Sequence, residues 1–354
     1  MNLDKLKDQP RLLLQAKLKP ILGSLFQPTG FPDLGPATFK AADSSGALRS
    51  MLLVESHQSM ANHFERVCWD ESKSAPVEDL QGLPYVESTL PDGTKTNSIL
   101  EAHRLNSPYI VNTAEFSEIE KAIGFEKNKP FDRRKLAAAL WKYDPSSLLH
   151  GIFLEKVGGV VRLPRALTAF IEAEDAIPAT SGGVKLDRIQ PESTGDKTPY
   201  GKAKDGYGNV PHHIEDFTGS IHAYFNLDLA LLRGLGLPDV AYRFLVCFAL
   251  YKIRRFLAEG LRLRSRCDLE LVSIEVVGAL KGQFDLPELK DIAQQMKDIL
   301  IEAKGQIGKS PLPVAYDTKL AAKRSKAKEK DKDKSNDTKT GDAAETDNEE
   351  ASNT

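Results

Sequence analysis

The stretch Thr218–Leu229, TGSIHAYFNLDL, alternates between polar and apolar side chains almost without interruption. In an extended strand the polar and apolar sets lie on opposite sides: Ser220, His222, Tyr224, Asn226 and Asp228 against Ile221, Ala223, Phe225, Leu227 and Leu229. A period of two is typical of a half-buried β-strand with one polar face. The stretch therefore predicts a sheet with one face on the core and one in solvent.

The residues after this stretch favour an α+β fold built around that sheet. An apolar helical segment covers Val240–Leu257, and Leu261–Arg266, LRLRSR, then alternates again with arginine on one side. Strand, helix and strand in this order, with a polar and basic open face, indicate a sheet that holds RNA. A pocket that turns over a small molecule is the less favoured interpretation.

Composition sets broad limits on partners and location. The 354 residues carry a net charge of −2, so the overall charge does not argue for nucleic acid, and any basic surface must be local. Residues 241–270 provide one, with seven Arg or Lys against three acids. Three scattered cysteines indicate a reducing cytoplasm, and no apolar run approaches the roughly 18 residues of a membrane span.

Other segments give the expected organisation. Arg11–Lys19 predicts a first strand, and Ser56 predicts the N-cap of a helix over His57–Val67. Residues 165–175 fit helix or strand. Ala179–Asn209, rich in Gly and Lys, reads as a long irregular loop, which in a compact domain is usually functional or disordered. The charged tail Asp317–Thr354 has too few apolar residues to fold and is expected to be disordered.

A search for catalytic chemistry finds little. GxSxG, HExxH, CxxC and phosphate-loop patterns are absent, and adjacent His212 and His213 would point to opposite faces of a strand. We therefore expect no enzyme activity, no metal and no cofactor. Asp33, in the loop after the first strand, is the one acid considered as catalytic, and a turn residue after Pro32 is the favoured explanation for it.

Binding chemistry offers more candidates, at spacings that can follow phosphates. The outward faces of two predicted strands and the first turns of a helix carry them: Lys17 and Lys19; Arg262 and Arg264, with Arg266; and Gln58, Ser59 and Asn62. Basic edges that prevent aggregation, or ordinary helix capping, would produce the same patterns. The aromatic motif of RNA-recognition sheets does not occur, which predicts contacts to the RNA backbone more than base stacking.

The chain resembles the backbone RAMP subunit, of the Cas-seven type, from the type I-G CRISPR surveillance complex, formerly I-U. The resemblance covers about residues 11–275. The matching segments are Arg11–Leu14, Gly23–Ser24, Phe26–Gly35, Val54–Ser56, Gln58–Asn62, Ser98–Tyr109, Leu148–Gly151, Arg162–Ala166, Ala223–Leu229, Leu261–Arg264 and Cys267–Leu269.

The resemblance implies a ferredoxin-like (RRM-like) palm with inserted thumb and finger elements, within one RAMP-type domain over 1–316. It implies a non-catalytic subunit that polymerises along a CRISPR guide RNA in a Cascade-like complex, with target DNA bound through the guide. Partners would be further copies in a helical filament and the guide-end-capping and large subunits, with no membrane. Residues 179–209 are the candidate thumb. The further candidate RNA contacts are Arg104, Asn106, Arg162, Arg165 and Lys185.

Two alternatives stay open. Related RAMP subunits of type III complexes cut target RNA with a loop aspartate, and Asp33 occupies a comparable place. A structural assembly protein that never touches RNA is the other.

Overall fold

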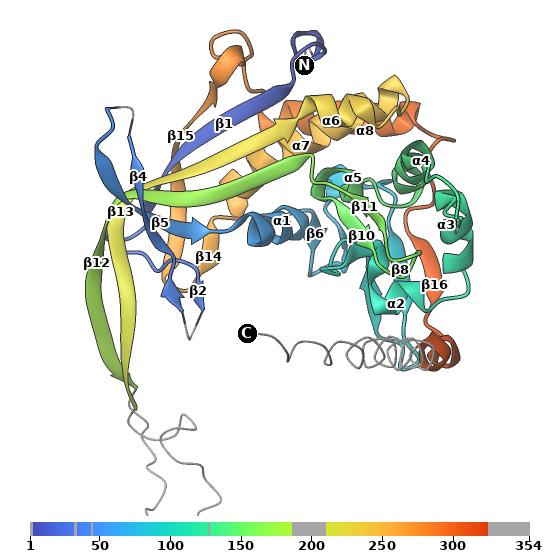
Figure 1. Ribbon diagram of the computed structural model, residues 1–354, viewed down its shortest axis with the longest axis horizontal. Coiled ribbons are helices and arrows are strands. Elements are labelled where there is room, and N and C mark those ends of the chain that lie inside the picture. The colour runs from blue at the N-terminus through green and yellow to red at the C-terminus, as the bar shows by residue number, and fades with distance from the viewer. Residues whose placement is uncertain (1–2, 32–33, 44, 127, 186–209, 325–354) are drawn as a thin grey trace, which may run out of the picture. The chain divides into compact units, whose positions relative to one another are not determined.

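The alternating segment around Tyr224 forms part of a long strand, β13 (Val210–Asp228), as its period of two predicts. In the computed structural model, which describes residues 3–31, 34–43, 45–126, 128–185 and 210–324, β13 lies inside a seven-stranded antiparallel sheet (Figure 1). The strands lie in the order β14 (Arg262–Arg264), β15 (Cys267–Val277), β1 (Arg11–Pro20), β13, β12 (Leu167–Lys185), β5 (Leu48–Glu55) and β4 (Thr38–Ala42).

The chain divides into two compact units, and this sheet belongs to the larger one. The larger unit comprises Met1–Gln81, Leu148–Gly151 and Pro164–Lys304, and the smaller one Gly82–Ser147, Ile152–Leu163 and Gly305–Thr354. A single RAMP-type domain was expected over 1–316, and most residues of both units lie in that range. Whether the two units form one domain stays a prediction.

Register across the three central strands gives the sheet one apolar face. Leu14 of β1 pairs with Phe225 of β13, which pairs with Ala169 of β12. Each of these side chains is buried, and so are the residues two positions along each strand. The first strand, predicted over Arg11–Lys19, turns alternate apolar residues to this face: Leu12, Leu14, Ala16 and Leu18.

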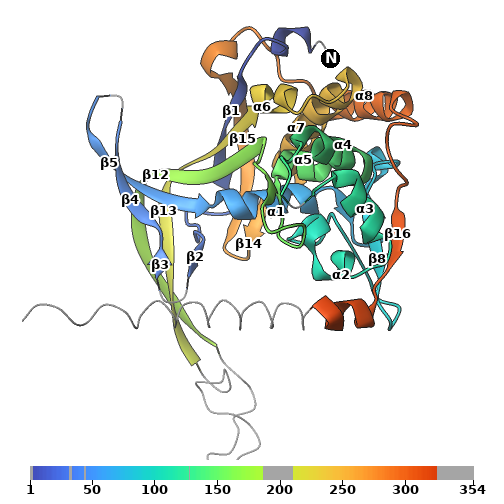
Figure 2. The ribbon, with the colours of Figure 1, turned by 45° about the vertical axis from the view of Figure 1, so that its right-hand side comes forward.

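Helices α1 (His57–Arg66) and α7 (Asp239–Glu259) bury this apolar face. The ring of Phe64 in α1 lies 6.2 Å from Phe225 and 5.6 Å from Phe256 of α7. Ser56 caps α1 by accepting a hydrogen bond from the Ser59 amide, as predicted. Helix α8 (Leu289–Glu302) packs on α7, and α6 (Leu229–Gly234) follows β13 directly (Figure 2). Neither α7 nor any other helix in the described residues is long and apolar enough to cross a membrane.

A buried lysine marks the centre of this core. Lys252 of α7 is fully buried, with Nζ 2.9 Å from Nε2 of His150 and 4.3 Å from the centre of the Phe248 ring. Burying an ammonium group is costly unless polar or aromatic neighbours compensate it. One of the seven basic residues counted in segment 241–270 therefore serves the fold and not the surface.

The smaller unit is built from short elements. One sheet holds β16 (Leu312–Ala315), β8 (Val86–Thr89) and β9 (Lys95–Asn97), with β16 parallel to β8. A hairpin pairs β10 (Ile152–Leu154) with β11 (Val161–Leu163). The helices are α2 (Pro108–Val111), α3 (Phe116–Ile123) and α4 (Arg133–Tyr143), and α5 (Ser146–His150) links the two units.

Short two-stranded pairs complete the larger unit. They are β2 (Gly30–Phe31) with β3 (Gly35–Pro36), and β6 (Trp69–Asp70) with β7 (Ala75–Pro76).

Strands β12 and β13 continue past the sheet as a curved two-stranded ribbon (Figure 1). The ambiguous segment 165–175 is mostly strand, and the expectation of an irregular stretch from Ala179 is wrong for its first seven residues, which extend β12 to Lys185. Cross-strand pairing satisfies the backbone there despite two glycines. The remainder of the candidate thumb, residues 186–209, lies outside the described residues.

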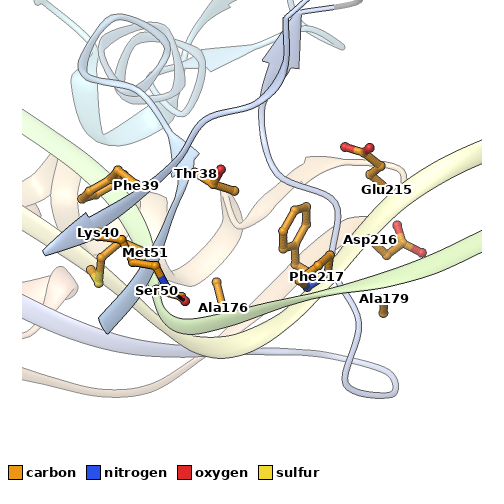
Figure 3. A pocket seen from close by; sticks show the side chains of 11 residues that line it. Thr38, Phe39, Lys40, Ser50, Met51, Ala176, Ala179, Glu215, Asp216 and Phe217 are labelled. Atoms are coloured by element: carbon orange, nitrogen blue, oxygen red, sulfur yellow. Dashed lines mark hydrogen bonds between the residues drawn. The ribbon is translucent and has the colours of Figure 1, made fainter. Parts of the chain in front are cut away.

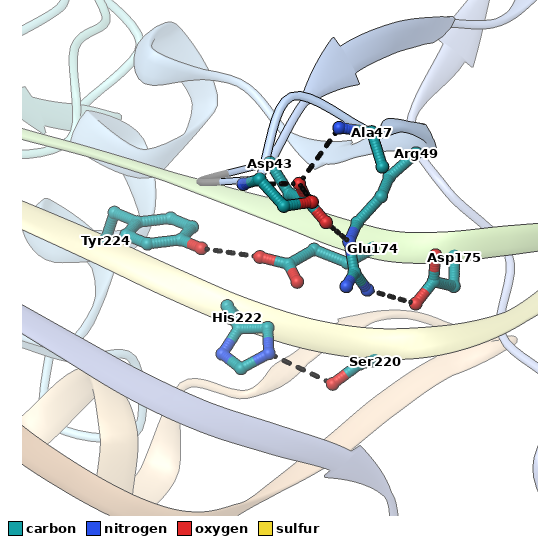
Figure 4. A network of polar contacts seen from close by, with 9 residues as sticks. Asp43, Ala47, Arg49, Glu174, Asp175, Ser220, His222 and Tyr224 are labelled. Atoms are coloured by element: carbon teal, nitrogen blue, oxygen red, sulfur yellow. Dashed lines mark hydrogen bonds and ion pairs between the residues drawn. The ribbon is translucent and has the colours of Figure 1, made fainter.

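A β-bulge marks the bend between sheet and ribbon. Pairing shifts register between Glu174 and Ile177, and Asp175 has a φ of +51°, in the left-handed region. Asp175 is held by Arg49, which also bridges to Asp43 in the β4–β5 turn, at 2.8 and 2.9 Å (Figure 4). Hydrogen bonds from Ser45 and Arg49 hold the pKa of Asp43 well below its usual range. A bulge of this kind bends a strand and increases its twist.

The start of the charged tail is ordered. The Asp317 amide donates to the Asn112 carbonyl, and the Asp317 carboxylate accepts from the Lys319 and Leu320 amides at the start of a helical turn over 318–324. Disorder was expected from Asp317 onward, and this expectation is wrong for residues 317–324. The rest of the tail lies outside the described residues.

Gly219 opposite the bulge gives a test of this bend. A Cβ there would lie 2.9 Å from the Glu174 carbonyl oxygen, and the φ of +158° disfavours other residues. We expect Gly219→Ala to lower the free energy of unfolding by about 1–3 kcal/mol. The matched control is Gly234→Ala at the end of α6, where nothing lies within 4 Å, and it should be neutral or stabilising by about 0.4–1 kcal/mol. Urea unfolding of the wild type and the two variants measures these changes. Equal urea midpoints for Gly219→Ala and the wild type would contradict a steric requirement for glycine at the bulge.

Candidate nucleic-acid interface

The solvent-facing side of the sheet carries ordered rows of polar and aromatic side chains. In one row, Gln15 of β1 pairs with Tyr224 of β13, which pairs with Phe170 of β12. In the next row, Lys17 pairs with His222, which pairs with Glu172. All but Lys17, which is exposed, are half-buried. This side is therefore polar, as the sequence predicted, but it also contains aromatic rings and a carboxylate.

The two lysines of β1 differ in what they contact. Lys17 is exposed and has no hydrogen bond or ion pair among the described residues. Lys19 is exposed as well, but its Nζ lies 2.9 Å from a carboxylate oxygen of Glu270 on β15. Exposed pairs of this kind contribute little to stability. Lys17 is the better-placed cation for an anionic ligand.

Three aromatic rings lie side by side across two strands and the start of α1. The His57 and Phe170 ring centres are 4.8 Å apart, and those of Phe170 and Tyr224 are 5.1 Å apart. We call His57, Phe170 and Tyr224 the ring column. The sequence analysis missed it, because the three residues are far apart in the chain and only strand pairing brings them together. The signal available was the position of Tyr224 on the polar side of its strand.

Carboxylates border the ring column. The Tyr224 hydroxyl donates to Oε1 of Glu174 at 3.3 Å, while His222 is held by Ser220 at 3.0 Å and by Gln15 at 3.3 Å (Figure 4). Burial, together with the charge of Glu174, raises the pKa of Tyr224 to about 12. Burial and the same neighbour raise the pKa of Glu172. The open side near the rings is thus not the basic surface that the sequence suggested.

The basic residues of segment 241–270 do not form the basic surface that the sequence suggested. Six of its seven basic residues are engaged with groups of the protein itself: Arg243 with Asp239 and Glu302, Lys252 with His150, Arg254 with the carbonyls of Leu286 and Pro287, Arg255 with the Val67 carbonyl, Arg264 with Glu55 and Arg266 with Asp216. Arg262 is exposed and has no partner within the described residues. The local excess of positive charge mostly holds the fold together.

Arg264 shows how such a contact works. Its guanidinium donates to the Gln27 and Val54 carbonyls at 2.9 and 3.3 Å and forms an ion pair with Glu55, whose side chain is 3% exposed. Burial alone would raise the pKa of Glu55, but the polar side chains of His63 and Ser59 and the charge of Arg264 lower it overall. Arg264 therefore holds the fold together, and its contact with RNA stays a prediction.

Arg266 is likewise paired with Asp216, which is 1% exposed. Asp216 is among the residues of an open cavity of about 540 Å³ between the β4–β5 pair and the β12–β13 ribbon (Figure 3). Phe39, Met51 and Phe217 give this cavity a largely apolar wall. Because its buried carboxylate is neutralised by Arg266, the cavity offers mainly apolar contact.

Two of the three candidate residues in the first turns of α1 are exposed to solvent. Gln58 and Asn62 are exposed, whereas Ser59 is half-buried and its hydroxyl donates to the Ser56 carbonyl. His57, the first residue of α1, is exposed as a whole. Partial burial of its imidazole and, second, the charge of Arg165 lower its pKa. Arg165 itself is half-buried. Gln58 and Asn62 remain available to a ligand, while Ser59 has a structural role in the cap.

The candidates in the smaller unit divide into buried and exposed residues. Arg104 is 7% exposed and Asn106 is 9% exposed, with the Asn106 side-chain oxygen accepting from the Lys156 amide. Their predicted contact with RNA is not supported, because both side chains are enclosed by protein. Arg162 is exposed, with its guanidinium 5.6 Å from the centre of the Phe153 ring.

Two candidates cannot be placed by their side chains. Lys185 is the last described residue of β12, and its side chain lies outside the description. Asp33 also falls outside the described residues, so the alternative catalytic assignment stays a prediction.

The structure does not gather the candidates into one cluster. Lys17 on β1 is separated from the end of β5, where α1 begins, by β13 and β12. Arg262 lies on β14 at the edge of the sheet, with β15 between it and β1. A ligand that reaches these residues must therefore be extended, as a single-stranded nucleic acid is.

The Arg264–Glu55 pair gives a testable prediction. Arg264→Gln leaves a buried carboxylate uncompensated, and we expect it to cost about 3 kcal/mol at neutral pH, toward the low end because Arg264 is partly exposed. The control, Arg262→Gln on the same strand, should change stability by less than about 0.5 kcal/mol.

The pH dependence of this cost follows from the lowered pKa of Glu55. Its stabilising contribution is present above the usual glutamate pKa of 4.5 and is lost as pH falls through the lower native value. In Arg264→Gln, protonation relieves the buried charge, so the gap to the wild type should narrow below about pH 4.5. Chemical unfolding at pH 7 and pH 4 measures the stability difference between the wild type and Arg264→Gln at each pH. A difference that is larger at pH 4 than at pH 7 would show that the charge of Glu55 is not its cause.

Two solved structures are similar to this chain over most of its length, at low identity. Among solved structures, a "CRISPR RNA-guided surveillance complex, pre-nicking" is similar at 13% identity over 82% of this chain and 89% of that one, with a TM-score of 0.38. Csc2 from Thermofilum pendens is similar at 14% identity over 86% and 79% of the two chains, with a TM-score of 0.31. We draw no conclusion from likenesses at such scores. A comparison with curated protein sequences found no significant match.

The family comparison is more informative. Residues 12–178 match the family described as CRISPR-associated protein GSU0053, which is of the Cas-seven type. This segment contains β1, β5, α1, most of the smaller unit and the first part of β12, and it includes Lys17, His57 and Phe170. Over residues 12–178, the chain is therefore similar to the Cas-seven-type family of CRISPR-associated protein GSU0053, in line with the sequence resemblance.

Proposed function

We propose that this protein is a non-catalytic backbone subunit that binds CRISPR guide RNA in a type I Cascade-like surveillance complex used for target DNA recognition in antiviral defence. The family match over residues 12–178 carries this proposal. The solvent-facing side of the sheet supports it, because it combines an exposed Lys17 with polar side chains along an extended path.

The architecture suggests which parts perform which role. The larger unit would be the ferredoxin-like palm, and the β12–β13 ribbon would lead into the thumb. The smaller unit, most of it inserted between α1 and β12, would supply finger elements. In this arrangement base pairing reads the sequence, while the protein holds the guide by its backbone and shape.

The proposed partners follow from that role. Copies of the chain would line up along one guide in a filament, with guide-end-capping and large subunits completing a type I-G complex in the cytoplasm. Target DNA would be bound through the guide, and no partner would be a membrane.

Co-expression with a transcript containing CRISPR repeats tests the proposal. We expect the purified protein to carry RNA of uniform length in assemblies much larger than one 39.0 kDa chain. The loaded assembly should bind DNA complementary to the guide and leave complementary RNA uncut. Cleavage that is lost in Asp33→Ala would instead support the ribonuclease, and RNA-free protein would support a purely structural role.

Salt dependence tests whether Lys17 meets a phosphate. The logarithm of affinity for single-stranded RNA should fall linearly with the logarithm of salt concentration, and Lys17→Gln should reduce that slope by about 0.7. Lys290→Gln, at an exposed position of α8, is the matched control and should leave the slope unchanged. Fluorescence anisotropy with a labelled oligoribonucleotide at several salt concentrations provides the measurement. Equal slopes for all three proteins would exclude a phosphate contact at Lys17.

A further inference from the structure

We propose that the ring column of His57, Phe170 and Tyr224 is a stacking site for an unpaired nucleobase of single-stranded RNA. The inference rests on the proposed function and makes it more specific. It assigns to one place on the sheet a contact with a base, where the sequence alone predicted contacts to the RNA backbone.

The first support is the position of the rings. They lie 4.8 and 5.1 Å apart, at interplanar angles of 31° and 24°, on the side of the sheet away from α1's Phe64 and the core. His57 is exposed, and Phe170 and Tyr224 are half-buried, so part of the aromatic surface faces solvent. Aromatic side chains on an open sheet are the usual surface on which single-stranded bases stack.

The second support is the charge around the rings. Glu174 accepts from the Tyr224 hydroxyl, and Glu172 lies in the adjacent row on the same strand. Two carboxylates would repel a phosphate placed over the rings, whereas a base is uncharged and can offer N–H donors. The cation Lys17 lies two strands from Phe170, beyond His222. Neighbouring strands are about 4.8 Å apart, so a nucleotide can stack on the rings while its phosphate is directed toward Lys17.

The third support is that the polar groups beside the rings are already paired. His222 is held by Gln15 and Ser220, and Tyr224 by Glu174. These contacts fix the orientation of the groups instead of leaving them free to recognise the edge of one particular base. Stacking of this kind tolerates any base, because each has an aromatic face. A site with these properties suits a guide whose sequence varies.

The experiment compares two probes that differ only in their bases. One is a ten-nucleotide adenosine RNA, and the other is a ribose-phosphate oligomer of the same length that lacks bases. Full-length protein is titrated with each at several salt concentrations. The variants are Phe170→Leu and Tyr224→Leu, with Tyr224→Phe as the variant that keeps the ring. The matched control is Phe39→Leu, an exposed aromatic residue of β4 outside the ring column.

We expect Phe170→Leu and Tyr224→Leu each to weaken binding of the adenosine RNA about 5- to 150-fold, the equivalent of 1–3 kcal/mol per stacked base. Tyr224→Phe and Phe39→Leu should bind it like the wild type. The salt slope should not change, because it counts phosphates. Affinity for the oligomer without bases should be the same in all five proteins, which also shows that the leucine variants are folded.

Other outcomes overturn the inference and separate it from the proposed function. If the wild type binds both probes equally, or if the leucine variants bind the adenosine RNA normally while Lys17→Gln weakens it, RNA binding stands and the stacking site does not. If the leucine variants change the size of the assembly without changing RNA affinity, the ring column packs against protein. If the wild type binds neither probe, the proposed function fails together with the inference.

Discussion

Burial of one face of the β1, β13 and β12 strands against α1 and α7 is the interaction on which the larger unit depends. The buried residues of neighbouring strands meet in register, as Leu14, Phe225 and Ala169 do, and Phe64 and Phe256 cover them. Because side chains alternate along a strand, each residue committed to this core assigns its neighbours to solvent. The position of Tyr224 and Phe170 on the open side is thus a consequence of the packing of Phe225 and Ala169.

The alternation of buried and exposed side chains also explains which elements could be predicted from the sequence. Local patterns in the sequence were sufficient for β1, for β13, for the Ser56 cap of α1 and for the extent of the core helix α7. These features depend on residues within a few positions of one another. The continuation of β12 to Lys185 was missed, because its glycines are stabilised by pairing with β13 and not by local preference.

The candidate site was harder to predict, because charge and shape depend on partners distant in sequence. The arginines of segment 241–270 were expected to be on the surface, but Arg264 and Arg266 meet Glu55 and Asp216, which are buried acids from other strands. Arg262 is the one basic residue of that segment that has no partner among the described residues. The ring column was missed for the corresponding reason, since Phe170 and Tyr224 become neighbours through the antiparallel pairing of β12 with β13. A count of charged residues in a window therefore overestimates the basic surface of a folded sheet.

The pairing of β16 with β8 has a consequence for how the chain emerges from the ribosome. Strand β8 is made early, and its parallel neighbour β16 is close to the end of the described chain. Domains generally fold during synthesis from the N-terminus, yet this sheet cannot close until residues 312–315 have been translated. The central strand β1 likewise waits for β13 and β15. Nascent chains of this protein must hold unpaired strand edges for most of their synthesis, so the rate of translation and the presence of chaperones bear directly on its yield.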